Sequence, residues 1–116
     1  MIIRLKRVYE SPHENDGRRI LVDRIWPRGL SKAKAALDYW MKDIAPSDEL
    51  RKWFDHRDER WDEFRRAYLA ELDQHGDRLA ELESLAKKET VTLLFAAKDE
   101  LRNNAVVIRE WLHCKG

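Results

Sequence analysis

Two short stretches of this sequence place cations, carboxylates and helix-capping side chains directly after apolar runs. In residues 19–34, the apolar run ends in Asp23 and Arg24, a Trp-Pro-Arg-Gly turn follows, and Ser31 can cap a helix. Residues 98–104 follow a second apolar run with a similar mixture of side chains. Guanidinium forks and the backbone N–H groups at a helix start both favour phosphate or carboxylate groups. The residue types therefore indicate a site for an anion.

A parallel sheet is the arrangement that would bring these two stretches together. If the strands that end near Asp23 and Ala97 run parallel, their carboxyl ends lie at one sheet edge, where ligands of open α/β sheets bind. Arg24, Arg28 and Lys98 would then be the charge partners of a small anionic or phosphorylated ligand. The predicted ligand-binding residues are Asp23, Arg24, Arg28, Ser31, Lys98, Asp99, Asn103 and Asn104.

The polar side chains of this set have two interpretations that the sequence leaves open. In the first, Asp23 and Asp99 orient the cations or contact a ligand hydroxyl, and Asn103 caps its helix beside the anion. In the second, the same residues are only structural: Asp23 forms a salt bridge with Arg24 or Lys98, and Asn103 is no more than a helix cap.

Catalytic chemistry has weaker support than binding. The sequence contains no Gly-x-Ser-x-Gly motif, P-loop or dinucleotide-binding glycine pattern. Ser31 has no base that the sequence reveals, and Cys114 lies near the end of the last predicted helix. A noncovalent hydrolase or transferase with Asp23 or Asp99 as general base is the more plausible reaction, and the choice between enzyme and binder stays open. No metal site or cofactor is predicted, because the four histidines are widely separated: His13, His56, His75 and His113.

A nucleic-acid-binding module is the main alternative, with a protein-interaction module without a ligand as a third. Residues 1–34 carry nine Lys or Arg against four Asp or Glu, and Tyr9 and Trp26 could stack on bases. However, a pI near 7.9 is low for a domain that binds duplex through phosphate contacts. For an interaction module, Trp53 or Trp61 would be the exposed aromatic anchor. The basic stripe would comprise Arg4, Lys6, Arg7, Arg18, Arg19, Arg24, Arg28, Lys32 and Lys34.

Composition indicates one compact domain over residues 1–116. The chain is 43% hydrophobic and 39% charged with a net charge of +1, and its five Trp argue against disorder. The single cysteine excludes an intramolecular disulfide and fits a reducing compartment. No apolar run is long enough to span a membrane, so we expect a cytoplasmic protein of unknown oligomeric state.

Strands are predicted at 2–8, 20–25 and 90–97. The segment 37–44 fits either a strand or more helix, and its aromatic content favours a strand. The run 90–97 is continuously apolar, which is typical of a central strand that is covered on both faces. Together with the helical segments between them, these strands predict an α/β fold with a small, mostly parallel sheet flanked by helices.

Helix starts are indicated by capping residues. Ser31 should cap a short basic helix, Ser47 a helix that ends near residues 55–56, and Asp58 the longest helix. A break is expected at Gly76 and Asp77, before a further helix with an apolar stripe. Asn103 or Asn104 should cap the final helix.

Several motifs together resemble the YeaO-like branch of the domain-of-unknown-function family 488. The resemblance covers nearly the whole chain, with the motifs in the family's order, and it implies a compact bacterial α/β domain without an established reaction. The motifs are Val-Asp-Arg-Ile-Trp-Pro-Arg-Gly-Leu-Ser-Lys (22–32), Ile-Ala-Pro-Ser (44–47), Leu-Arg-Lys-Trp-Phe (50–54), Arg-Trp-Asp-Glu-Phe (60–64), Thr-Leu-Leu-Phe-Ala-Ala-Lys-Asp (92–99) and Asn-Ala-Val-Val (104–107).

The resemblance also implies a departure at the start of the last helix. Wider members of the family often carry a Cys-His-Arg triplet there, whereas this chain has Asn103, Asn104 and Ala105. A thiolate at that place would be activated by the helix dipole. Because this chain has an amide instead, the departure counts against covalent cysteine chemistry and leaves in place the anion-friendly geometry that the residues themselves indicate.

Overall fold

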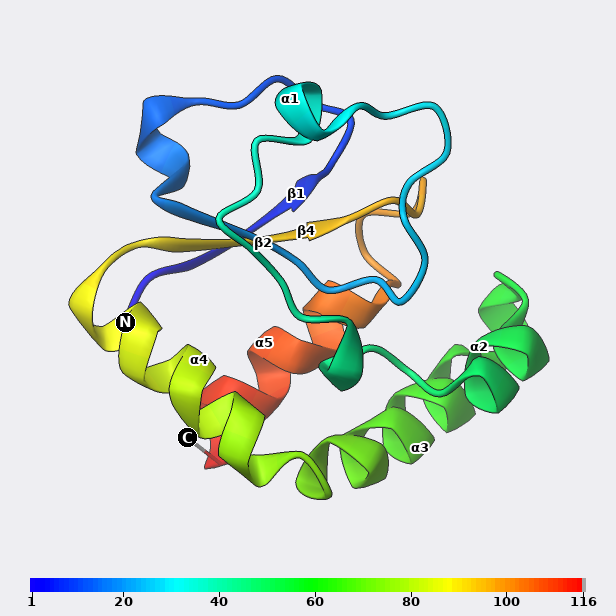
Figure 1. Cartoon of the computed structure of the whole chain (residues 1–116). Helices are drawn as coiled ribbons and strands as arrows, with labels where there is room; N and C mark the ends of the chain where they lie inside the picture. Colours follow the sequence, from blue (N-terminus) through cyan, green and yellow to red (C-terminus); the bar gives the residue numbers. More distant parts are fainter. Residues whose placement is uncertain (116) are drawn as a thin grey trace.

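The computed structural model describes residues 1–115 and has the predicted α/β architecture (Figure 1). The strands are β1 (Ile3–Arg7), β2 (Arg18–Leu21), β3 (Tyr39–Trp40) and β4 (Val91–Phe95). The α-helices are α1 (Lys32–Ala35), α2 (Asp48–Phe54), α3 (Trp61–Asp73), α4 (Gly76–Lys88) and α5 (Asn104–Lys115). Short 3-10 turns are η1 (Glu14–Asp16), η2 (Lys42–Ile44) and η3 (Asp58–Arg60). Within residues 1–115, no helix is long and apolar enough to cross a membrane.

The four described strands form one sheet in the order β1-β4-β2-β3, and every pair is parallel. All five residues of β4 are buried, which confirms the predicted central strand. β4 pairs with β1 on one side and with β2 on the other, so the carboxyl ends of β2 and β4 lie at the same edge.

The two faces of the sheet are covered by different layers. Val91, Leu93 and Phe95 of β4 contribute to the larger apolar cluster, which also contains residues of α3, α4 and α5. Leu94 points to the opposite face, as the alternation of a strand requires, and joins a smaller cluster with Ala35 of α1. Figure 1 shows the same division, with α1 on one side of the sheet and α2 to α5 on the other.

Two strand predictions were wrong in extent. β2 covers Arg18–Leu21 instead of 20–25, because Asp23 uses its side chain to accept the N–H of Ala96 and so leaves the regular ladder. The ambiguous segment 37–44 contains only the two-residue strand β3, followed by the turn η2.

The helix caps agree with the sequence except at one position. Ser31 accepts the N–H of Lys34, Ser47 accepts that of Leu50, and Asn103 accepts that of Val106. The prediction for Asp58 was wrong: this residue lies inside η3, and the N-cap of α3 is Arg60 without a side-chain bond. The break between α3 and α4 falls at residues 74–75, just before the predicted one.

Candidate functional site

A cleft of about 1140 Å³ lies beside the carboxyl ends of β2 and β4. The loops that follow these strands reach the side of the molecule where α2 lies (Figure 1). Most of the predicted ligand-binding residues line this cleft: Asp23, Arg24, Arg28, Lys98, Asp99, Asn103 and Asn104. The segments that follow β2 and β4 therefore meet at one sheet edge, which is the geometric condition for a shared site.

Ser31 is the predicted residue that does not line the cleft. Its side chain is exposed, and its hydroxyl oxygen accepts the N–H of Lys34 at 3.1 Å. In this structure the hydroxyl therefore caps α1, a helix of four residues that packs on the smaller apolar cluster through Ala35.

Asp23 lies in the cleft wall between β2 and β4. Its carboxylate accepts the N–H of Ala96 and the side-chain amide of Asn104, both at 2.9 Å. Burial raises the pKa of Asp23 above its usual value, and these hydrogen bonds and the charge of His56 oppose the rise without reversing it. The salt bridge with Arg24 or Lys98 in the second interpretation does not form: Asp23 has no ion pair with any described side chain.

Asn104 is held in one orientation by its two donated hydrogen bonds. Its Nδ2 donates to the carbonyl of Val22 at 2.7 Å and to Asp23 Oδ1 at 2.9 Å. Since a backbone carbonyl only accepts, the amide cannot be turned the other way without losing this bond. The carbonyl oxygen Oδ1 of Asn104 has no partner among the described residues and is not a buried unsatisfied atom. It is therefore an accessible acceptor on a residue that lines the cleft.

Two of the predicted charged residues, Arg24 and Asp99, form hydrogen bonds or ion pairs within the chain. The guanidinium of Arg24 donates to the carbonyls of Ala45 and Pro46 at 3.2 Å each, which ties the loop after β2 to the start of α2. Asp99 accepts the N–H of Leu101 and pairs with Arg102 at 3.2 Å. The hydrogen bond from Leu101 and the charge of Arg102 hold the pKa of Asp99 below its usual value. Both residues thus shape the wall.

Three cations of the cleft have no ion-pair partner among the described side chains. Arg28 comes from the loop after β2, Lys98 from the loop after β4, and Lys52 from α2. Arg28 and Lys98 were predicted from the sequence, whereas Lys52 was missed. No local signal placed Lys52 near the sheet, since its position depends on the packing of Phe54 against Phe64, whose ring centroids are 4.3 Å apart.

The charge of the cleft is positive. Its described lining contains six Lys or Arg side chains and three Asp carboxylates, with no Glu. Arg51 and Arg102 were also missed by the sequence analysis, but both have carboxylate partners, Asp48 and Asp99. The excess positive charge therefore lies mainly on the three unpaired cations.

Part of the cleft lining is apolar. Ile25 is 57% exposed and Tyr9 is 42% exposed, whereas Phe54, which also lines the cleft, is buried. Trp26 is a packed corner, as expected for a residue before proline: its indole N–H donates to the carbonyl of Leu30, and its ring meets that of Trp40 edge to face. The cleft thus combines free cations with hydrocarbon surface.

The sequence is similar to proteins of one known family. The sequence family DUF488-N3i, described as the inactive DUF488-N3 subclade, matches residues 2–115. The chain belongs to this family. The uncharacterized protein YeaO of Escherichia coli K12 is 49% identical over 112 residues, which cover 97% of each chain. The uncharacterized proteins Mb3100c of Mycobacterium bovis and Rv3073c of Mycobacterium tuberculosis are each 43% identical over 111 residues, covering 96% of this chain and 93% of the relative. No solved structure matches the chain.

In this DUF488-N3i chain, the start of α5 holds amides where the resemblance implied a thiol for wider members. Asn103 caps the helix, and Asn104 bonds to Asp23. The only cysteine of the sequence, Cys114, is exposed near the opposite end of α5. The lining of the cleft, as the structure describes it, contains no thiol.

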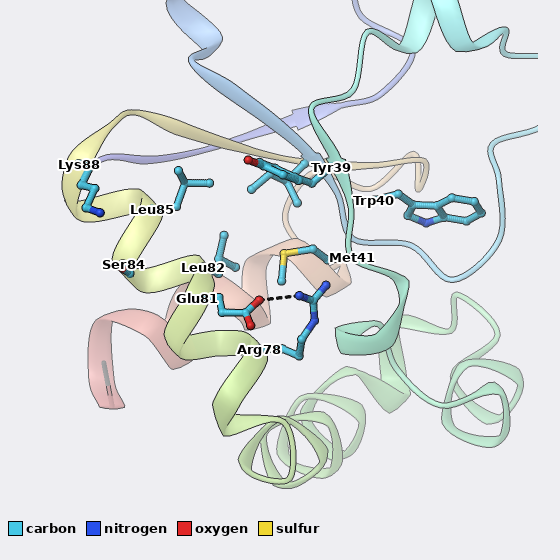
Figure 2. A pocket seen from close by; sticks show the side chains of 10 residues that line it. Tyr39, Trp40, Met41, Arg78, Glu81, Leu82, Ser84, Leu85 and Lys88 are labelled. Atoms are coloured by element: carbon cyan, nitrogen blue, oxygen red, sulfur yellow. Dashed lines mark hydrogen bonds and ion pairs between the residues drawn. The ribbon is translucent and has the colours of Figure 1, made fainter.

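A second cavity of about 400 Å³ lies between β3 and α4 (Figure 2). Tyr39 and Met41 line it from the sheet side, and Leu82 and Leu85 from α4. Arg78 also lines this cavity, and its guanidinium pairs with Glu81 and with Asp43, each at 2.6 Å. Lys88 lines the same cavity and has no ion pair with any described side chain, so this cavity of the DUF488-N3i chain has one unpaired cation where the larger cleft has three. Within residues 1–115, no cluster of His, Cys, Asp and Glu is arranged to hold a metal ion.

Proposed function

We propose that the cleft of this DUF488-N3i protein binds a small anionic or phosphorylated ligand without covalent catalysis. One observation carries the proposal: Arg28, Lys52 and Lys98 line a single cleft from three separate segments and have no ion pair with any described side chain. Cations that face one cavity repel each other unless an anion lies between them, so the arrangement is more favourable with a bound anion.

The surroundings support the same proposal. The cleft lies at the carboxyl edge of a parallel sheet, where ligands of such sheets bind. α5 begins at Asn104 in the cleft wall, so the positive end of its dipole adds to the favourable potential. Arg24 contributes by holding the loop after β2 to the carbonyls that precede α2, which fixes the two walls relative to each other.

Isothermal titration calorimetry with pyrophosphate, inorganic phosphate and sulfate tests the proposal. We expect binding that weakens as ionic strength rises, because screening reduces the attraction between exposed charges. Arg28→Gln and Lys98→Gln should each reduce pyrophosphate affinity at least several-fold. The matched controls are Arg4→Gln and Lys34→Gln, which remove equally unpaired, exposed cations outside the cleft. Equal losses in the cleft variants and the controls would mean that net charge, and not this site, attracts the anion.

The structure favours this function over nucleic-acid binding. Several members of the predicted basic stripe are used inside the chain: Lys6 and Arg19 pair with Asp16, and Arg18 pairs with Glu89. Fluorescence anisotropy with short oligonucleotides across a salt series separates the two functions, since phosphate-backbone binding has a steep salt dependence. Submicromolar, strongly salt-dependent oligonucleotide binding would contradict the small-ligand proposal.

The interaction-module alternative rests on the two predicted aromatic anchors. Trp53 is 39% exposed, and its ring lies under the guanidinium of Arg60 at 5.2 Å. Trp61 is half-buried and packs against Phe54 and Phe64. An exposed apolar anchor would need a wider apolar surface around it than Trp53 has, given its exposed charged neighbours on α2. The cleft is therefore the better-supported site.

A further inference from the structure

We infer that the ligand of the cleft is a nucleoside phosphate, bound with its phosphate at the unpaired cations and its base against the apolar wall near Ile25. This inference rests on the proposed anion binding and adds the chemical class of the ligand. Three independent features carry it: the size of the cleft, its apolar wall, and a fixed acceptor beside Asp23.

The cleft is much larger than a simple oxyanion would fill. Sites for small organic molecules and cofactors occupy roughly 300–1,000 Å³, and the cleft at about 1140 Å³ is slightly larger than that range. A phosphate group alone would leave most of this space to water. A ligand that fills the cleft therefore carries a sizeable body next to its anionic group.

The apolar wall indicates what kind of body this is. Ile25 follows Arg24 in the loop after β2 and leaves 57% of its surface exposed, although it is a large aliphatic residue. Tyr9 also lines the cleft, and its hydroxyl donates to the carbonyl of Arg28 at 2.9 Å. The guanidinium of Arg7 lies over its ring, 5.2 Å from the centroid. A flat heteroaromatic ring packs well against aromatic and branched aliphatic side chains, and it removes their exposed surface from water.

The third feature is a hydrogen-bond acceptor of fixed orientation. Asn104 Oδ1 is accessible, and the two bonds donated by Nδ2 prevent the amide from turning. An amide oxygen pairs with an N–H or O–H donor, and an acceptor left unpaired by a ligand weakens binding. Nucleobases and ribose both supply such donors, whereas an alkyl phosphate does not.

The combination distinguishes between phosphorylated ligands. A sugar phosphate satisfies the cations and the amide but leaves Ile25 exposed. An alkyl phosphate covers Ile25 but leaves the amide unpaired. A nucleoside phosphate satisfies all three features at once, which is why we choose it.

Calorimetric titration of the full chain with a matched series of compounds tests the inference. The series comprises AMP, GMP, CMP and UMP, with ribose 5-phosphate, butyl phosphate, adenosine and inorganic phosphate for comparison. We expect at least one mononucleotide to bind ten-fold or more tightly than ribose 5-phosphate and butyl phosphate, and adenosine to bind more weakly than AMP. If ribose 5-phosphate or butyl phosphate equals every nucleotide, the nucleoside inference is overturned while anion binding stands. If no phosphate compound binds, both proposals fail.

A pair of isoleucine variants tests the apolar wall separately. Ile25→Ser should weaken nucleotide binding several-fold and leave ribose 5-phosphate affinity unchanged. Ile2→Ser is the control, because Ile2 is also 57% exposed but does not line the cleft. Both residues are exposed, so neither change should prevent folding. Unchanged nucleotide affinity in Ile25→Ser would overturn the placement of the base.

Discussion

Asn104 donates its side-chain amide to the carboxylate of Asp23 at 2.9 Å, although 81 positions separate the two residues in the sequence. Asp23 follows β2, and Asn104 is the first residue of α5 after β4. The bond therefore joins the two strand-to-loop junctions that form the cleft. The amide of Asn104 also takes the place of the cation with which a carboxylate at this sheet edge would be expected to pair.

Replacing Asn104 by aspartate should destabilise the fold. Asn104→Asp loses the two donated bonds and places a second carboxylate beside Asp23, so we expect a loss of about 2–3 kcal/mol at pH 7. The loss should shrink as the pH falls from 7 to about 4, because one of the two adjacent carboxyl groups takes up a proton above its ordinary pKa near 3.9. Urea denaturation at both pH values measures it.

The neighbouring residue offers a matched control for this substitution. Asn103→Asp keeps the oxygen that accepts the N–H of Val106, and it adds a negative charge at a helix start, where the dipole favours it. The bond from Asn103 to the carbonyl of Asp99 is lost, and the new charge is placed on a side chain that is only 3% exposed. We expect a cost of about 1–2 kcal/mol, which is below that of Asn104→Asp because the amide of Asn103 has no carboxylate partner. Equal costs for the two variants would show that a new carboxylate at this junction is unfavourable at either position, and that the bond to Asp23 is not the cause of the loss.

The raised pKa of Asp23 predicts a particular pH dependence. Its folded-state pKa lies above the unfolded value near 3.9, so the folded state holds the proton more tightly. The contribution of this group to stability is full below about pH 4 and is lost as the pH rises through the folded-state pKa. Carbon-13 NMR titration of the carboxyl group should show the raised pKa directly. In Asp23→Asn, this decline in stability with rising pH should disappear; a decline of the same size in both proteins would contradict its assignment to Asp23.

Asp16 should behave in the opposite way. Burial by itself would raise its pKa, but the N–H of His13 and the cations Arg19 and Lys6 outweigh burial and lower it. Stability from this group is therefore present above the unfolded value near 3.9 and is lost as the pH falls through the folded-state pKa. Asp16→Asn leaves the buried Arg19 with a weakened partner, and we expect a loss of about 3 kcal/mol at pH 7.

An exposed carboxylate tests whether burial causes the large effect of Asp16→Asn. Asp43 pairs with Arg78 at 2.6 Å, but both side chains are at least 40% exposed. Asp43→Asn should therefore cost less than about 1 kcal/mol in the same urea experiment. A similar loss at Asp43 and Asp16 would contradict the importance of burial.

The fold and the location of the cleft were predictable because their signals are local. The apolar run of 90–97 identified β4, Ser47 identified the start of α2, and the charged residues after two strands identified the sheet edge. The partners of Asp23 were not predictable, because Ala96 and Asn104 lie 73 and 81 positions away. From a sequence alone, the general expectation is that a carboxylate pairs with a nearby cation. Only the folded structure shows that the partners of Asp23 are the N–H of Ala96 and the amide of Asn104.

The sequence also did not predict that α2 contributes Lys52 to the cleft, because this contribution depends on tertiary packing. The chain turns after Phe54 through positive φ angles at Asp55 and His56. Asp and His adopt this conformation more often than most residues with a side chain, but still too seldom for the sequence to predict the turn. That turn directs the chain into η3 and lets Phe54 stack on Phe64 of α3, which places Lys52 in the cleft lining. The position of Lys52 is thus a product of tertiary packing.

Gly17 is the position where a single methyl group should damage the fold most. It has φ +64° after η1, and a Cβ built there lies 2.1 Å from the carbonyl oxygen of Thr90. The same oxygen accepts the N–H of Arg18 at 2.9 Å, where β2 begins to pair beside β4. Because backbone atoms on both sides are fixed by the sheet, Gly17→Ala should separate the strands there and cost more than about 3 kcal/mol.

Gly29 provides the control that separates this clash from backbone strain. It has φ +74°, but a Cβ there meets no atom within 4 Å. Gly29→Ala should therefore cost only the penalty of the left-handed conformation, about 1–2 kcal/mol. Urea denaturation of both variants gives the comparison. If the two losses are equal, strain alone accounts for the glycine at position 17; if Gly17→Ala is the more damaging, the close approach of Thr90 requires a residue without Cβ at the entrance to the central strand pair.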